Sequence, residues 1–152
     1  MKLKNPLLVV TDIDRSVSFY QAVLGLHVIM DFGANKTLTG GLVLQTAETY
    51  RQFIGTSEIL FGGNNIEIYF EEDHFDSFAD KLNAFDIEYI HPVIEHAWGQ
   101  RVVRFYDPDH HIIEVGENMK AVCRRFLDSG MTPEQAAARM DVPIKFIYAC
   151  MR

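Results

Sequence analysis

One carboxylate stands among apolar residues near the end of a predicted hairpin. The run 101–115 is typical of a strand, a tight Asp-Pro-Asp turn at 107–109 and a second strand, with Glu114 in the middle of the second strand. Asp followed by Pro favours a type I turn, so the hairpin is well specified. A buried glutamate is costly unless it meets a cation, a metal ion or several hydrogen-bond donors. Glu114 is therefore the first candidate for chemistry.

An internal repeat in the sequence points to a second candidate carboxylate. When the sequence is shifted by 62 positions, Asn5 falls on Glu67 and Asp14 falls on Asp76. A lone glutamate in an alternating strand such as 67–71 usually lies on the solvated face, and an asparagine before a proline is typical of a strand entry. The repeat alone makes Asn5 and Glu67 candidates beside Glu114.

The elements around these residues form two similar sets. Each set starts with a strand, continues with a helix and ends with further strands, as the hydrophobic periodicity predicts. Thr11 or Asp12 can cap the first helix, Gly25 can end it, and Asp73 can cap the second helix. The expected strands are 7–10, 26–32, 42–45, 66–70, 87–90, 102–106 and 111–115, and the expected helices are 12–23 and 73–85.

The hairpin and the repeat together resemble the vicinal-oxygen-chelate superfamily, which includes glyoxalases, bleomycin-resistance proteins and extradiol dioxygenases. The resemblance covers about residues 4–117. It implies an α+β fold of two tandem βαβββ modules that form a cupped, incomplete barrel. One departure is His110, which stands where the family usually has glycine after Asp-Pro-Asp. Histidine tolerates the left-handed region better than most residues, so the turn can survive.

The resemblance also implies a metal site with four ligands. Carried over residue by residue, the ligands are Asn5 and Glu67 from the first strand of each module, and Gln45 and Glu114 from the last. Two carboxylates and two amides form an oxygen-rich set that suits Mn²⁺, Mg²⁺ or Ca²⁺ better than Zn²⁺. Without a metal, Glu67 and Glu114 would need a cation such as Arg101 or Arg104, or one of them would act as a general acid or base.

The segment before the hairpin carries side chains suited to binding a small molecule. Trp98 offers a flat apolar wall, Arg101 a two-pronged anchor for a carboxylate, and His91 or His96 a proton carrier near neutral pH. The alternative is a structural loop in which the tryptophan covers the core and the arginine pairs with a glutamate. Similarly, residues 48–53 are either a lid over a ligand or an ordinary surface helix.

Three functions remain open at this point. The first is a metal-dependent enzyme of the lyase, isomerase or dioxygenase type, with catalysis by Glu67 and Glu114. The second is a metal-free binding or sequestering protein of the bleomycin-resistance type, its cleft lined by Trp98, Tyr69 and Phe105. The third is a ligand sensor that uses a C-terminal helical extension.

That extension begins near residue 118, after a domain at 1–117. Helices are expected at 119–127, 132–140 and 144–151, with some likeness to a helix-turn-helix. Residues 117–152 carry six basic and four acidic side chains, a net charge of +2, whereas the whole chain carries −7. This charge balance disfavours nucleic acid as the main partner.

The composition of the chain indicates the cellular environment that we expect for the protein. The apolar runs are too short to span a membrane, and the N-terminus lacks an apolar signal core. Cys123 and Cys150, the two cysteines, are expected to be reduced thiols in a cytoplasmic protein. Exposed sheet edges favour a homodimer.

Overall fold

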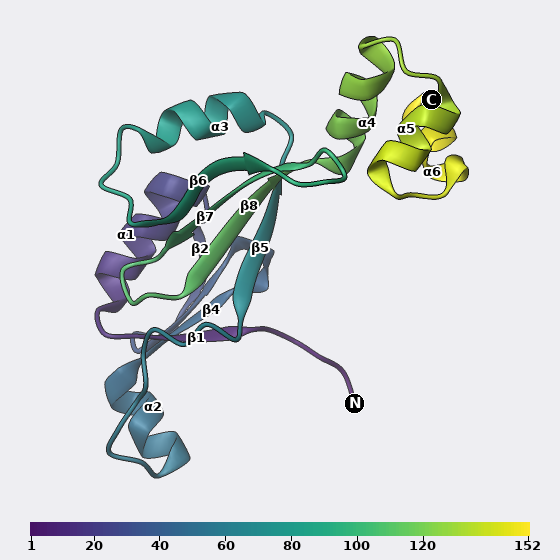
Figure 1. Cartoon of the computed structure of the whole chain (residues 1–152). Helices are drawn as coiled ribbons and strands as arrows, with labels where there is room; N and C mark the ends of the chain where they lie inside the picture. Colours follow the sequence, from purple (N-terminus) through teal and green to yellow (C-terminus); the bar gives the residue numbers. More distant parts are fainter. The chain divides into compact units, whose positions relative to one another are not determined.

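The computed structural model describes residues 1–152 as two compact units (Figure 1). The first unit comprises residues 1–66 with 106–112, and the second comprises residues 67–105 with 113–152. Each unit is described by itself below. None of the helices is long and apolar enough to cross a membrane.

The first unit contains a four-stranded sheet in the order β1-β4-β3-β2. Strand β1 pairs with β4 in parallel, whereas β4 with β3 and β3 with β2 are antiparallel pairs. Leu8 and Val10 of β1 are buried, and so are Tyr20 and Val23 of the helix α1. The elements are β1 (Leu7–Val10), α1 (Ile13–Leu24), β2 (Val28–Asp31), β3 (Asn35–Leu38), β4 (Val43–Thr46) and α2 (Ala47–Ile54).

The second unit repeats this order with β5-β8-β7-β6, so the first strand again neighbours the last. Each sheet comes from one strand-helix-strand-strand-strand module and remains open, which confirms the predicted α+β fold of tandem modules. The elements are β5 (Glu67–Glu72), α3 (Phe75–Leu82), β6 (Tyr89–Glu95), β7 (Arg101–Tyr106) and β8 (Ile112–Glu117).

Three elements differ notably from the sequence prediction. Strand β3 was not expected, because its sequence, Asn-Lys-Thr-Leu, has little apolar alternation to reveal it. Strand β6 continues to Glu95 although it contains Pro92, which is compatible with its place at the edge of the sheet. Helix α3 begins after His74, whose backbone N–H bonds Glu72 Oε1 at 2.7 Å, and the expected cap by Asp73 is not formed.

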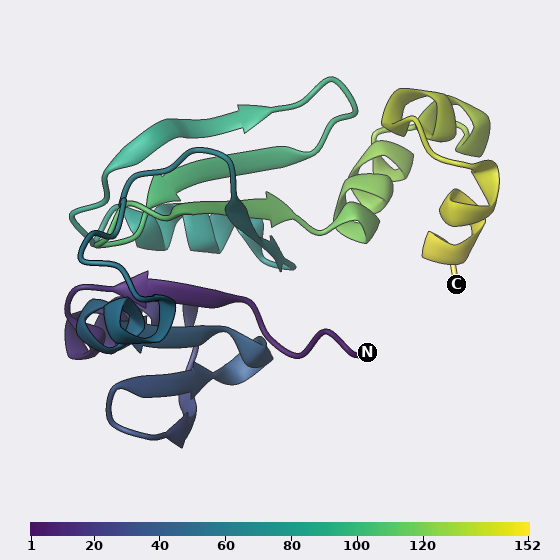
Figure 2. The same cartoon turned by 90° about the horizontal axis from the view of Figure 1, so that it is seen from below.

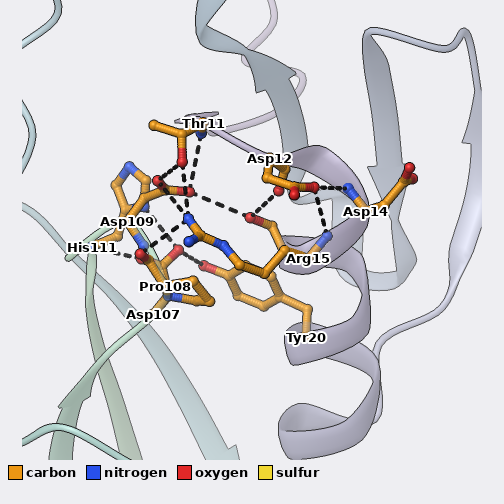
Figure 3. A network of polar contacts seen from close by, with 10 residues as sticks. Thr11, Asp12, Asp14, Arg15, Tyr20, Asp107, Pro108, Asp109 and His111 are labelled. Carbon is orange, nitrogen blue, oxygen red and sulfur yellow. Dashed lines mark hydrogen bonds and ion pairs between the residues drawn. The ribbon is translucent and has the colours of Figure 1, made fainter.

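The Asp-Pro-Asp turn is held to the start of α1 by a buried polar network (Figure 3). Asp109 Oδ1 accepts hydrogen bonds from Thr11 Oγ1 at 2.5 Å and from Arg15 at 3.1 Å. Asp12 caps α1 by accepting from the backbone N–H groups of residues 14 and 15. The chain therefore uses these aspartates to fix the turn and the helix start.

Asp107 is the centre of the same network. Its carboxylate accepts from Tyr20 Oη at 2.9 Å, from His111 Nδ1 at 2.8 Å and from the backbone N–H groups of Asp109 and His111. Burial by itself would raise the pKa of Asp107, but the hydrogen bonds and charge of His111 hold that pKa below its ordinary value. Burial, and then the charge of Asp107, raise the pKa of Tyr20 well above its ordinary value.

His110 adopts a left-handed backbone with φ of 63°, and its ring lies 5.0 Å from that of Tyr106. We expect His110→Gly to be tolerated or to stabilise the protein by about 0.5 kcal/mol, because glycine adopts positive φ without steric cost. His110→Ala removes the same ring but keeps a Cβ atom, so it should be about 1 kcal/mol less stable than His110→Gly. Urea denaturation of both variants measures the difference, and equal midpoints would contradict a conformational cost at residue 110.

The C-terminal extension forms three helices, α4 (Met119–Asp128), α5 (Pro133–Met140) and α6 (Ile144–Cys150), which follow β8 (Figure 2). Asn118 caps α4, and Thr132 with Gln135 forms a capping box at α5. The three helices bury a core of their own, made of Val122, Cys123, Phe126, Ala136, Ala137, Met140, Ile147 and Cys150.

Candidate functional site

One polar residue from each strand of the second sheet joins a line of contacts that we call the charged row. Its members are Glu67 on β5, Glu114 on β8, Arg104 on β7 and His91 on β6. His91 and Arg104 are direct partners in the register of β6 and β7. The row therefore follows from the strand order and places Arg104 between a histidine and two carboxylates.

Arg104 contacts all three of its neighbours in the row. Its Nε donates to Glu67 Oε2 at 3.0 Å, one terminal nitrogen forms an ion pair with Glu114, and the other lies 3.2 Å from His91 Nε2. His91 Nδ1 lies 2.8 Å from the carbonyl oxygen of Pro92. Nδ1 therefore carries the proton, and Nε2 accepts from the guanidinium. Only 6% of Glu114 is exposed, so Arg104 supplies the cation that its burial requires.

The alternation of β7 separates the row from the core. Arg104 retains a side-chain exposure of 24%, whereas its neighbour Phe105 is fully buried, because successive side chains in a strand point to opposite faces. Phe105, which the sequence analysis placed in the wall of a ligand cleft, is therefore not accessible from the face that carries Arg104. Phe105 packs in the interior of the protein.

The two other residues predicted as metal ligands lie in the first unit, and each has a partner there. Asn5 Nδ2 donates to the carbonyl oxygen of Gly41 at 2.6 Å, which fits the strand-entry role that the sequence left open. Gln45 is 4% exposed, its Oε1 accepts from Asn35 Nδ2 at 2.7 Å, and its Nε2 donates to Thr49. The amide oxygen of Gln45, which a metal ion would need as a ligand, is therefore already hydrogen-bonded.

The charged row fits a resident guanidinium better than a divalent metal ion. Both carboxylates assigned to the metal bind Arg104, so an ion would have to displace this side chain. No group of three or more His, Cys, Asp or Glu side chains is placed to hold a metal ion in residues 1–152. Among the ways in which the sequence allowed Glu67 and Glu114 to be balanced, the structure contains the pairing with Arg104.

An aromatic platform, formed by His96 and Trp98, lies in the loop between β6 and β7. Their rings stack with centroids 4.2 Å apart, and Trp98 is 38% exposed. Burial lowers the pKa of His96, and the charge of Arg104 lowers it further.

Gln100 connects the platform to Tyr69 on β5. The Trp98 indole N–H donates to Gln100 Oε1 at 3.2 Å, and Gln100 Nε2 donates to Tyr69 Oη at 3.0 Å. A Cβ atom on Gly116 would lie 2.8 Å from Gln100 Nε2 and 3.0 Å from the Tyr69 ring, so a larger residue there would have to shift these two side chains. The side chains of Tyr69 and Trp98 are thus linked, and Tyr69 is also exposed.

Arg101 is engaged within the second unit. Its guanidinium pairs with Glu117 through Nε at 3.1 Å and a terminal nitrogen at 3.0 Å, and with Asp76 at 2.6 Å. Hydrogen bonds from Arg101 and Arg125 hold the pKa of Glu117 below its ordinary value, although burial by itself would raise it. A ligand carboxylate would have to displace Asp76 or Glu117. The structural alternative paired this arginine with a surface glutamate, whereas the structure pairs it with the buried Glu117 and the exposed Asp76.

The first unit contains a separate apolar groove of about 340 Å³. Helix α2 contributes Tyr50 and Ile54 to it, so the segment 48–53 is a helix that lines a groove. The other lining residues come from β1, from the segment 58–66 and from His111.

Comparisons with known proteins agree with this architecture. The family model for the Glyoxalase-like domain matches residues 3–120. A protein of unknown function from Agrobacterium tumefaciens str. C58 has a similar structure, with 41% identity, a TM-score of 0.72 and coverage of 78% of this chain and 94% of its own. A glyoxalase/bleomycin resistance protein/dioxygenase from Nocardioides shares 23% identity and a TM-score of 0.63 over 77% of this chain and 83% of its own, which supports the fold alone. The uncharacterized protein YraH of Bacillus subtilis (strain 168) is 28% identical over 76% of this chain and 97% of its own length.

Proposed function

The chain belongs to the glyoxalase-like domain family, and we propose that it is a metal-independent member that binds a small, planar, cationic organic molecule. One observation carries this proposal: Arg104 pairs with both Glu67 and Glu114, the two carboxylates to which the family resemblance assigns a metal ion. The metal-dependent lyase or dioxygenase activity stays a prediction that this pairing does not favour.

The sign of the ligand's charge follows from the composition of the row. Two carboxylates face one guanidinium and a neutral imidazole, so one negative charge remains. The neighbouring cluster of Arg101, Arg125, Glu117 and Asp76 is balanced in charge, whereas the whole chain carries −7. A cation gains from these charges, whereas an anion is repelled by the carboxylates.

The shape of the ligand follows from the aromatic side chains. Tyr69 lies two residues from Glu67 on the same face of β5, and the Trp98 indole is linked to Tyr69 through Gln100. Both side chains are partly exposed, and the indole face favours a cation or a flat ring. Binding without turnover is the simplest use of such a site. We also retain the homodimer, because the edge strand β2 leaves apolar residues such as Ile29 and Met30 exposed.

A matched series of planar ligands tests the proposal. We expect N-methylquinolinium to bind more tightly than neutral quinoline, and quinoline carboxylate to bind least, in calorimetric titrations at neutral pH and low salt. Trp98 is the only tryptophan, so its emission reports whether the ligand reaches the platform. Glu67→Gln or Glu114→Gln should weaken binding of the cation about tenfold, which corresponds to about 1.4 kcal/mol.

The control is Glu134→Gln, which removes one carboxylate from the exposed first turn of α5. This variant should bind the cation as the unmodified protein does. Tightest binding of the carboxylate, or cation binding that leaves Trp98 emission unchanged, would overturn the proposed site.

A further inference from the structure

The loop that carries the aromatic platform is a short turn closed by its own backbone. His96 N–H donates to the carbonyl of Gln100 at 2.9 Å, and Gly99 N–H donates to the carbonyl of His96 at 2.8 Å. Gly99 has φ of 86°. The loop places Trp98 between these contacts, so the position of its backbone determines where the indole lies.

Two consecutive residues of helix α4, Arg125 and Phe126, contact this loop at Gly99. Arg125 donates from a terminal nitrogen to the carbonyl oxygen of Gly99 at 2.5 Å. The Phe126 ring fills the space beside Gly99 so closely that a Cβ atom there would lie 2.1 Å from Phe126 Cζ. The loop therefore has a polar and a steric contact with the same turn of the helix.

Arg125 is itself fixed by carboxylates of the second sheet. It pairs with Glu117 at 3.0 Å and with Glu95 at 3.5 Å, and its guanidinium lies 5.1 Å from the centre of the Phe126 ring. Arg139 of α5 also pairs with Glu95, at 3.3 Å. These contacts connect the extension to β6, which leads into the loop, and to β8, the neighbour of β7 in the sheet.

We infer that the C-terminal extension positions the aromatic platform, with Arg125 and Phe126 of α4 as the positioning residues. Both residues lie beyond position 120, where the match to the glyoxalase-like family model ends. The extension thus supplies part of the support for a site whose other members come from the family domain. That the platform binds a ligand rests on the proposed function, whereas the positioning does not.

The mobility of Trp98 in the full-length protein without ligand tests the inference. In Arg125→Gln, the Stern–Volmer constant for acrylamide quenching should rise about twofold and the anisotropy of the indole should fall, because the loop loses its polar contact with α4. Arg124→Gln is the matched control, because Arg124 is the adjacent residue and is exposed. Its quenching should equal that of the unmodified protein.

Thiol reactivity shows whether the extension stays folded in these variants. Cys123 and Cys150 are buried in its core, and burial, with the neighbouring Cys150 thiol, raises the pKa of Cys123 to about 11. Both thiols should therefore stay unreactive toward a disulfide reagent. If they react in Arg125→Gln, Gly99→Ala is used instead, because its added Cβ atom would overlap the Phe126 ring and force the loop and the ring apart. The same thiol assay then shows whether the extension stays folded in this variant.

Binding of N-methylquinolinium separates the inference from the proposed function. Its affinity should fall about tenfold in Arg125→Gln and stay unchanged in Arg124→Gln, because a disordered platform must be ordered again on binding. Unchanged quenching with protected thiols overturns the positioning role. Increased quenching with unchanged affinity supports the positioning role and overturns the proposed binding of the ligand at the platform. If the unmodified protein does not bind the probe, the proposed function fails and the quenching data alone decide the inference.

Discussion

Asp107→Asn is expected to lower the free energy of unfolding by about 3 kcal/mol, because it removes the charge from a buried carboxylate with four hydrogen-bond donors. Asparagine keeps the shape and the acceptor oxygen. Its NH₂ group, however, then faces Tyr20 Oη and His111 Nδ1, which both donate in the native network. Urea denaturation at neutral pH measures the loss as a lower midpoint with an unchanged slope.

The same variant has a defined pH dependence. The pKa of Asp107 is lower in the folded protein than its ordinary value, so its contribution to stability is fully present above the ordinary pKa of an aspartate. The contribution is lost as the pH falls through the lowered value, so the two proteins should converge in stability under acid. Asp12→Asn, at an exposed helix cap where asparagine serves equally well, should change stability by less than about 0.5 kcal/mol. A difference for Asp107→Asn that persists in acid would contradict the role of its charge.

Arg104→Gln is expected to destabilise the protein by about 2 kcal/mol, because it leaves the buried Glu114 without its cation. The loss is smaller than for a fully buried pair because Glu67 is partly exposed. The variant also frees two carboxylates and an imidazole nitrogen that now face a guanidinium. We therefore expect millimolar Mn²⁺ to raise the thermal midpoint of Arg104→Gln and not that of the unmodified protein.

Two controls make this result specific. The double variant Arg104→Gln, Glu114→Gln should lose the response to Mn²⁺, since one of the two carboxylates is gone. Sodium chloride of equal ionic strength should not reproduce the effect. A shift of the unmodified protein by Mn²⁺ that disappears in Glu114→Gln would restore the metal site implied by the family resemblance.

Much of the fold could be read from the sequence because the informative patterns are local. The cap at Asp12, the glycine at 25 and the Asp-Pro-Asp turn each fix an element boundary through their own backbone chemistry. Strand β3 could not be found this way, because its polar sequence is held by pairing with β2 and β4 and not by its own pattern. The repeat of 62 residues revealed the two modules, since each module has the same strand order.

The site was less accessible to sequence reasoning because it depends on register across strands. Glu67 and Glu114 were recognised through the repeat, and Arg104 was considered as their cation. The sequence could not show that Arg104 rather than Arg101 lies between them. Which arginine is used depends on the register between β6 and β7. This register pairs His91 with Arg104, and it shifts at irregularities on both sides of His91. Gln100 and Glu117 were missed, because their roles depend on partners distant in the sequence.

The guanidinium of Arg104 in the charged row differs from a bound metal ion in what determines whether its position is occupied. A metal site is occupied according to the free concentration of the ion, and every chelator competes for it. Arg104 is attached to the chain, and arginine is not deprotonated in proteins, so its positive charge is in place whenever the second sheet is folded. A cell starved of divalent metals would therefore make this protein with the charges of the row complete, and a chelator such as EDTA would leave them unchanged.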